Sequence, residues 1–151
     1  METLAEIKLY TLKILASREH SRWELRRKLS TKKINRELIE AVLGQLVEEG
    51  AQDDRRYAES YIRVRSKRGY GPVKIGQELK ERGVEKTIVA DKIMKSKLDW
   101  NQLAHLAHFK KFKSLPATAC ERSDQTRFLQ YRGFTLEQIR NALGGAFDEN
   151  G

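Results

Sequence analysis

Residues 78–93 read ELKERGVEKTIVADKI, two helical segments separated by a glycine, and the pattern returns fifty residues later as FLQYRGFTLEQIRNAL in residues 128–143. Gly83 and Gly133 stand where one helix ends and the chain turns, because glycine adopts the left-handed backbone conformation without strain. A third copy, in residues 28–43, has Lys33 in place of the glycine. The chain is therefore predicted to contain similar units in tandem.

Apolar residues keep the register of this repeat. The sets that coincide at the offset of fifty are Leu29, Leu79 and Leu129; Ile34, Val84 and Phe134; Ile39, Val89 and Ile139; Leu43, Ile93 and Leu143; and, further upstream, Leu12, Ile62 and Phe112. The upstream set adds one more helix to each copy. We predict an all-α fold of three tandem three-helix repeats that form an elongated, curved array.

The repeats are expected at residues 1–50, 51–98 and 99–144, followed by a flexible tail at 145–151. Expected helices are 4–16, 22–31, 36–49, 54–67, 72–82, 86–97, 100–114, 123–132 and 136–144. Expected N-cap residues, chosen for side chains that accept a backbone N–H, are Thr3, Ser21, Asn35, Asp53, Asp99 and Thr135. Glu24 and Gln138 follow two of these caps at the spacing of a capping box.

Basic residues are in excess and unevenly spread. The 30 Lys and Arg exceed the 21 Asp and Glu, which gives a net charge of +9. Residues 51–99 carry 13 of the basic and 8 of the acidic residues. A nucleic acid or an acidic protein surface is therefore the expected kind of partner.

One face of the helix expected at 54–67 carries Arg56, Arg63 and Lys67, opposite an apolar face. The positive charge continues through Arg68 and Lys74, which flank a Gly-Tyr-Gly turn. We interpret these residues as a binding stripe, and the alternative is a solvated helix face. Arg65 falls on the apolar side, and the sequence leaves its role open. Tyr70, in the turn, either stacks on a base or packs on its neighbours.

A second basic region includes Arg22, Arg26 and Arg27, for which helix C-terminal cations are the alternative explanation. His105 and His108 share a helix face, but a zinc site needs a third and usually a fourth ligand. Cys120 is alone, so no intrachain disulfide can form.

Catalytic and membrane signatures were not found. The sequence shows no activated nucleophile, phosphate-binding glycine loop or carboxylate pair, so we expect no enzyme, no metal and no cofactor. It also shows no signal peptide or membrane-spanning segment, so we expect a cytoplasmic protein without a membrane partner.

Three segments together resemble the RecX family of recombinase regulators: SRWELRRKL (21–29), DDRRYAESYIRVRSKRGYGPVKIGQELKERGV (53–84) and RFLQYRGFTLEQIRNAL (127–143). The resemblance implies three-helix units that lie in the groove of the RecA filament on DNA and modulate its ATPase, strand exchange and coprotease activities. DNA repair, recombination and the SOS response are the processes concerned. Arg56, Arg68 and Lys74 match basic positions of the family pattern. Lys33 departs from it, because family members often have glycine there.

The sequence therefore supports two alternative hypotheses for the function. The first is a monomeric, non-enzymatic regulator, expected to inhibit the RecA filament, that also binds DNA weakly and without sequence preference. The second is a helix-turn-helix-like DNA-binding protein that acts without a recombinase. Three equally spaced units suit a long groove better than a single recognition helix does, which favours the first.

Overall fold

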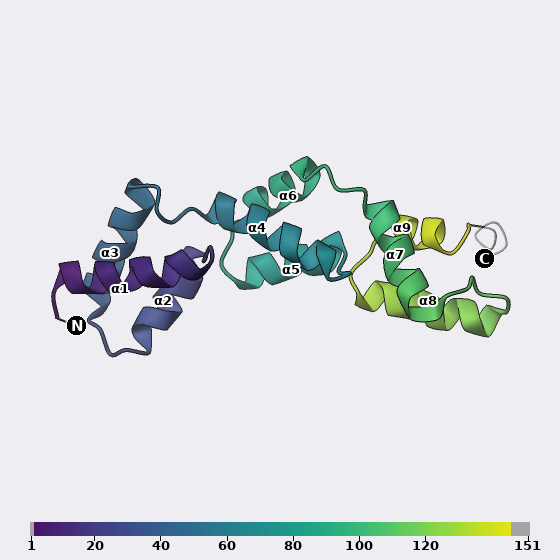
Figure 1. Cartoon of the computed structure of the whole chain (residues 1–151), viewed down its shortest axis with the longest axis horizontal. Coiled ribbons are helices and arrows are strands. Elements are labelled where there is room, and N and C mark those ends of the chain that lie inside the picture. Colours follow the sequence, from purple (N-terminus) through teal and green to yellow (C-terminus); the bar gives the residue numbers. More distant parts are fainter. Residues whose placement is uncertain (1, 146–151) are drawn as a thin grey trace. The chain divides into compact units, whose positions relative to one another are not determined.

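The computed structural model describes residues 2–145, and all regular secondary structure in this range is helical (Figure 1). In chain order, the nine helices of the described residues are α1 (Leu4–Ser17), α2 (Arg22–Ser30), α3 (Arg36–Glu48), α4 (Asp54–Lys67), α5 (Pro72–Glu81), α6 (Lys86–Lys95), α7 (Trp100–Phe112), α8 (Ala119–Tyr131) and α9 (Leu136–Ala142). The all-α prediction is confirmed, with a helix at each expected place. Apart from Gly145, the expected tail lies outside the described residues.

Side-chain caps begin several helices where they were expected. The predicted N-caps whose side chains accept a backbone N–H from the first helical turn are Thr3, Ser21, Asn35, Asp53, Asp99 and Thr135. Both predicted capping boxes are present, Ser21 with Glu24 and Thr135 with Gln138. These bonds satisfy N–H groups that have no acceptor inside the helix, so they fix where each helix starts.

Helix α8 starts four residues before the predicted position 123, and that prediction is wrong. Thr118 is the N-cap, and its hydroxyl accepts a hydrogen bond from the backbone N–H of Glu121 at 3.1 Å. The Glu121 carboxylate accepts the N–H of Ala117 at 2.9 Å. The Thr-x-x-Glu pattern at 118–121 contained the signal for this start.

The turns that close α2, α5 and α8 share one backbone feature. Gly83 and Gly133 have φ angles of 82° and 94°, as predicted, and Lys33 at the equivalent position has a φ of 59°. Gly83 is also restricted by space, since an added Cβ would lie 2.5 Å from Cβ of Trp23. Lys33 has to adopt the left-handed conformation with a side chain, which costs roughly 1–2 kcal/mol.

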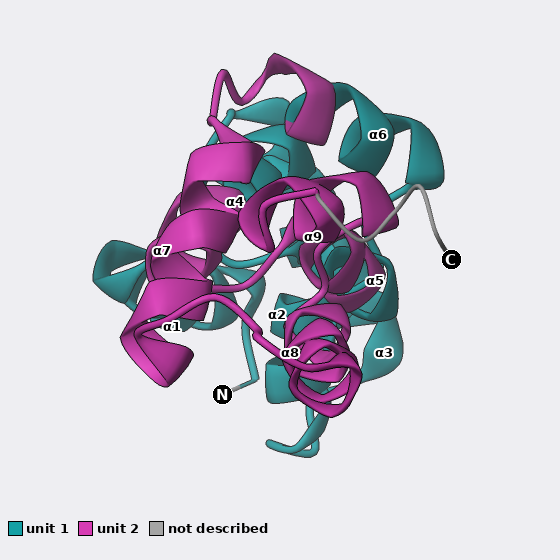
Figure 2. Ribbon diagram, turned by 90° about the vertical axis from the view of Figure 1, so that its right-hand side faces the viewer, with its two compact units in different colours: residues 1–60, 79–92 teal, residues 61–78, 93–151 magenta. Residues whose placement is uncertain are grey.

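The chain divides into two compact units (Figure 2). Unit 1 consists of residues 1–60 and 79–92, and unit 2 of residues 61–78 and 93–151. The division passes through α4, α5 and α6. It follows the packing of the chain rather than the sequence repeat, so the three repeat boundaries stay a prediction.

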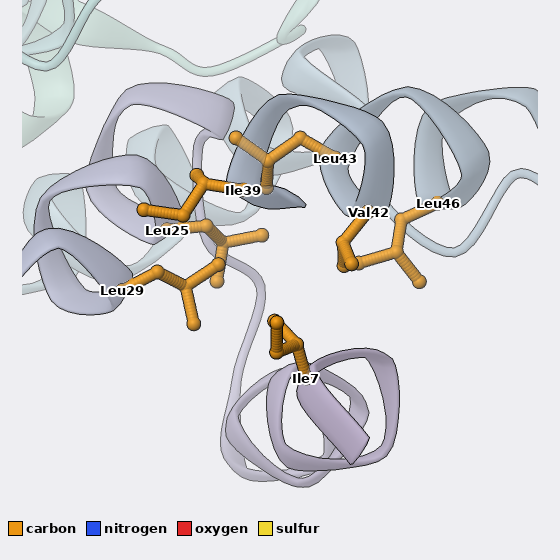
Figure 3. Packing of buried hydrophobic residues seen from close by; sticks show 7 residues of the cluster. All are labelled: Ile7, Leu25, Leu29, Ile39, Val42, Leu43 and Leu46. Carbon is orange, nitrogen blue, oxygen red and sulfur yellow. The ribbon is translucent and has the colours of Figure 1, made fainter. Parts of the chain in front are cut away.

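In unit 1, α1 and α2 both pack on α3. The core cluster takes one residue from α1, two from α2 and four from α3 (Figure 3), namely Ile7, Leu25, Leu29, Ile39, Val42, Leu43 and Leu46. Each is at most 2% exposed. The partly buried Ile34, which precedes the α3 cap, packs against this cluster, as a hydrophobic staple requires.

In unit 2, α7 packs against both α8 and α9. The buried cluster consists of Ala104, Ala107, Leu129, Phe134, Ile139, Ala142 and Leu143. Phe134 follows the left-handed Gly133 and is 3% exposed, so the turn directs an aromatic ring into the core. This core holds α7, α8 and α9 together.

Candidate functional site

The second half of the predicted stripe is an exposed cationic surface. Arg63 and Lys67 of α4 and Arg68 just after it are all exposed. Within residues 2–145, the side chains of these three residues form no ion pair. We call Arg63, Lys67 and Arg68 the α4 basic surface. It belongs to unit 2.

Arg56, which the sequence placed in the same stripe, is engaged inside unit 1. Its Nε donates to Glu19 Oε1 at 2.8 Å, and its Nη1 and Nη2 donate to the carbonyl groups of Gly50 and Ala51, both at 3.0 Å. The hydrogen bond to Glu19 raises the pKa of Arg56. Its donors therefore hold the α3–α4 connection within the fold.

Arg65 also has a structural partner. Its Nε and Nη2 donate to the two carboxylate oxygens of Glu78, at 3.0 and 2.9 Å, and Tyr61 donates its hydroxyl to the same carboxylate at 2.9 Å. Burial acts to lower the pKa of Arg65, but the hydrogen bonds and charge of Glu78 outweigh it and leave the pKa raised. A bidentate pair of this kind explains how an arginine occupies the apolar side of α4.

Tyr70 packs among cations of its own unit. The centre of its ring lies 3.9 Å from the guanidinium carbon of Arg65, 5.0 Å from that of Arg132 and 5.7 Å from the Lys74 ammonium. The same ammonium lies 5.4 Å from the ring of Tyr131. These contacts favour the packing explanation of Tyr70 over base stacking, and they hold Lys74 between two rings.

The Gly-Tyr-Gly turn has a structural reason. The N–H of Gly71 donates to the carbonyl of Arg132 at 2.8 Å, and the N–H of Val73 donates to that of Gly133 at 2.9 Å. A Cβ on Gly71 would lie 2.5 Å from the carbonyl carbon of Gly133. Glycine at position 71 thus lets the turn before α5 meet the turn after α8.

The second predicted region, on α2, is partly neutralised. Arg26 donates to both oxygens of Glu40, at 2.7 and 3.0 Å, and Arg22 lies 3.7 Å from the same carboxylate. The hydrogen bond from Arg26 lowers the pKa of Glu40. Arg27 is exposed, with its guanidinium carbon 4.8 Å from the centre of the Trp23 ring. Of the three arginines, Arg27 is thus the most available to a partner.

The structure adds cations that the sequence reasoning missed. A cavity of about 360 Å³ in unit 2 is lined by the cationic residues Lys67, Arg68, Lys110, Lys111 and Arg132 and by the apolar residues Leu103, Leu106, Ala107 and Phe128. We call it the unit 2 cavity. None of its described lining residues is acidic. The Lys110–Lys111 pair on a largely apolar helix was the available sequence signal.

The histidines have hydrogen-bond partners. His108 is buried, and its Nε2 lies 2.6 Å from the amide oxygen of Gln125. His105 Nε2 lies 3.0 Å from the amide oxygen of Asn141. In the part of the chain that the structure describes, no group of three His, Cys, Asp or Glu residues is arranged to hold a metal ion.

Two family models match the chain. Residues 8–46 match the first three-helix domain of RecX, and residues 53–92 match the second. A protein of Pseudomonas savastanoi pv. phaseolicola named Regulatory protein RecX is 40% identical over 146 residues, which cover 96% of this chain and 94% of the relative. The chain belongs to the RecX family.

Other RecX proteins agree in sequence and fold. The Regulatory protein RecX of Pseudomonas putida is also 40% identical over 96% of this chain and 94% of its own. The crystal structure of RecX from Lactobacillus salivarius matches with a TM-score of 0.78 at 19% identity, covering 94% of this chain and 95% of that one. A second crystal structure, of regulatory protein RecX, matches with a TM-score of 0.76 at 19% identity, covering 94% of this chain and 71% of that one.

Membership of this family is consistent with a regulatory protein rather than an enzyme. Among the described residues, every helix is too short or too polar to span a bilayer. The two matched domains together include every residue of both predicted basic regions.

Proposed function

We propose that this chain regulates DNA repair and recombination by binding the RecA recombinase filament on DNA and inhibiting its ATPase, strand exchange and coprotease activities. The observation that carries the proposal is the unneutralised α4 basic surface on a member of a family of regulatory proteins. In this proposal the protein is a cytoplasmic monomer of three three-helix repeats, with boundaries near residues 51 and 99.

The contact would be electrostatic and non-catalytic. Arg63, Lys67 and Arg68 would face DNA phosphates or an acidic filament surface. Lys74 and Arg27 would contribute further positively charged contacts. Arg56, Arg22 and Arg26 would support the fold near these contacts, because their donors are occupied by Glu19 and Glu40 or lie close to them. A protein that bridges neighbouring filament subunits would hinder the rearrangements that accompany ATP turnover, without chemistry of its own.

Bare DNA should be bound weakly and without sequence preference, through phosphates. Affinity for duplex DNA then falls steeply with salt, by a slope of about 0.9 for each phosphate contact on a double-logarithmic plot. The alternative function, a helix-turn-helix-like DNA-binding protein acting alone, would instead show strong sequence selectivity and no need for the filament.

The test is co-sedimentation with RecA filaments and with bare DNA. The variant carries Arg63→Gln, Lys67→Gln and Arg68→Gln, and we expect it to lose filament binding and ATPase inhibition in parallel. Its salt slope on duplex DNA should fall by about 2–3, one contact for each cation removed.

A matched control removes three exposed cations from unit 1, with Lys13→Gln, Arg36→Gln and Lys86→Gln. The control has the same net charge as the variant, so it separates a local contact from a general charge effect. Unchanged filament regulation by the α4 variant would overturn the proposal. Strong preference for one DNA sequence would favour the alternative.

A further inference from the structure

Helix α7 exposes large apolar side chains beside the unit 2 cavity. Leu106 and Phe109, one helical turn apart, are 55% and 63% exposed, and Leu115 after the helix is 55% exposed. A second hollow of about 410 Å³ is lined in part by these three residues, and Leu106 also lines the unit 2 cavity. Two adjoining hollows thus share one apolar border, and both lie within unit 2.

Cations line the unit 2 cavity next to this apolar surface. Lys110 and Lys111 follow Phe109 directly on α7, both are exposed, and Arg132 reaches the unit 2 cavity from the end of α8. Arg132 is held in position, since its Nη1 donates to the carbonyl of Arg68 at 3.2 Å. The described residues lining the unit 2 cavity supply no carboxylate to neutralise these charges.

The aromatic ring that lines the unit 2 cavity, Phe128, already contacts neighbouring side chains. The Phe128 ring lies 5.0 Å from the guanidinium carbon of Arg132 and 5.9 Å from the Lys111 ammonium, and Phe112 meets it edge-on at 5.3 Å. A base would have to displace these contacts in order to stack. Leu103 and Leu106 make no favourable contact with a charged phosphate. These apolar side chains therefore fit an apolar partner better than a nucleic-acid backbone.

We infer that these two hollows dock an acidic, amphipathic helical segment of a partner protein. Apolar side chains of the segment cover Leu106, Phe109 and Leu115. Its carboxylates pair with Lys110, Lys111 and Arg132, so that hydrophobic burial and charge complementarity act on the same face. The inference goes beyond the proposed function, because it concerns α7 and α8 and does not require the partner to be the recombinase.

The probe is a fluorescent synthetic peptide of about 18 residues, with leucines at the helical spacing i, i+3, i+4, i+7 and glutamates elsewhere. Its binding to the full chain is measured by anisotropy. Two comparison peptides, one with the same residues in scrambled order and one of glutamate alone, report charge without an apolar stripe. A single-stranded oligodeoxynucleotide is titrated in parallel.

Two variants test the two halves of the surface. Leu106→Ser with Phe109→Ser should weaken binding of the amphipathic peptide about tenfold or more, and should leave binding of the glutamate peptide unchanged. Lys110→Gln with Lys111→Gln should weaken binding of both peptides and reduce the salt dependence. The control Leu9→Ser with Val47→Ser removes exposed apolar groups from unit 1 and should leave all affinities as they are.

Equal binding of the amphipathic peptide by the wild type and the Leu106/Phe109 variant would overturn the inference. Oligonucleotide affinity that falls with this variant would reassign the surface to nucleic acid. Self-association of the chain that the variant abolishes would reassign it to a second copy, and much tighter peptide binding by a chain ending at Gly145 would reassign it to residues 146–151. Filament sedimentation of the same variants reports separately on the proposed function.

Discussion

Arg56 contributes to folding through three acceptors outside its own helix. The ion pair with Glu19 is exposed enough to be worth little, whereas the two bonds to backbone carbonyls each contribute about 0.5–1.5 kcal/mol. Arg56→Gln is therefore expected to lower the free energy of unfolding by about 1–2 kcal/mol in urea titrations. Arg55→Gln, at an exposed neighbouring position, is the control and should have little effect. Equal stability of the two variants would contradict this role.

His20 is held as a neutral imidazole. It is 1% exposed, its Nδ1 lies 3.0 Å from the carbonyl oxygen of Arg18, and its Nε2 lies 2.9 Å from the Lys28 ammonium. Nδ1 is therefore assigned as the donor and Nε2 as the acceptor. Burial lowers the pKa of His20 most. The hydrogen bond to the Arg18 carbonyl raises the pKa, the charges of Arg18 and Lys28 lower it, and Glu24 raises it slightly, so the pKa stays below its ordinary value.

The lowered pKa of His20 predicts a loss of stability in acid. Below the unfolded pKa of about 6.5, the histidine is protonated in the unfolded chain but stays neutral in the folded chain. The free energy of unfolding therefore falls as the pH falls, by up to about 1.4 kcal/mol per pH unit. His20→Gln should flatten the pH dependence between about pH 7 and pH 5. The exposed His105→Gln is the control. An unchanged slope in His20→Gln would show that other groups cause the loss.

At the scale of the helices, the turn between α2 and α3 is strained. Lys33 has a φ of 59°, whereas the equivalent positions after α5 and α8 are glycines. Lys33→Gly should raise the free energy of unfolding by about 0.5–1 kcal/mol, because relief of the strain exceeds the greater flexibility of glycine in the unfolded chain. Urea titration provides the measurement. Lys32→Gly, at a position without positive φ, should destabilise the protein instead.

Most helix boundaries could be predicted from the sequence because capping is local. The side chains of Ser21 and Thr135 act on N–H groups three residues away, so spacing alone reveals them. The start of α8 differs from the predicted one although Thr118 and Glu121 have the same spacing, because the fifty-residue register places the start later along the chain. The apolar register is likewise an incomplete guide to burial. Leu12 is 37% exposed, while the neighbouring Thr11 is fully buried and donates its hydroxyl to the carbonyl of Ile7.

At the scale of the whole molecule, the elongated array of three repeats stays a prediction that solution scattering can measure. A globule of this length would have a radius of gyration of roughly 15 Å. We expect a clearly larger value and a scattering profile of a rod-like particle, because repeats that contact mainly their neighbours extend along one direction. A value near that of the globule would contradict the array.

The tertiary structure, rather than the pattern of charges, decided which cations are available to a partner. The sequence grouped Arg56 with Arg63 and Lys67 by helical phase, but Glu19, 37 residues away, neutralises the first. In the same way Glu78 accounts for Arg65, whose role the sequence left open. Folding also brings Arg132 to within hydrogen-bond distance of the carbonyl of Arg68, 64 residues away.

The sequence by itself determined the helical class, the places of the turns, most of the caps and the family. Each of these depends on residues within a few positions of one another, or on their order along the chain. Only the tertiary structure decided that Arg56 and Arg65 are bonded within the fold, and that Lys110, Lys111 and Arg132 line one cavity with Lys67 and Arg68. The physical reason is that an ion pair or a cavity wall joins side chains that are far apart along the sequence. Their separation along the sequence carries no information about their distance in space.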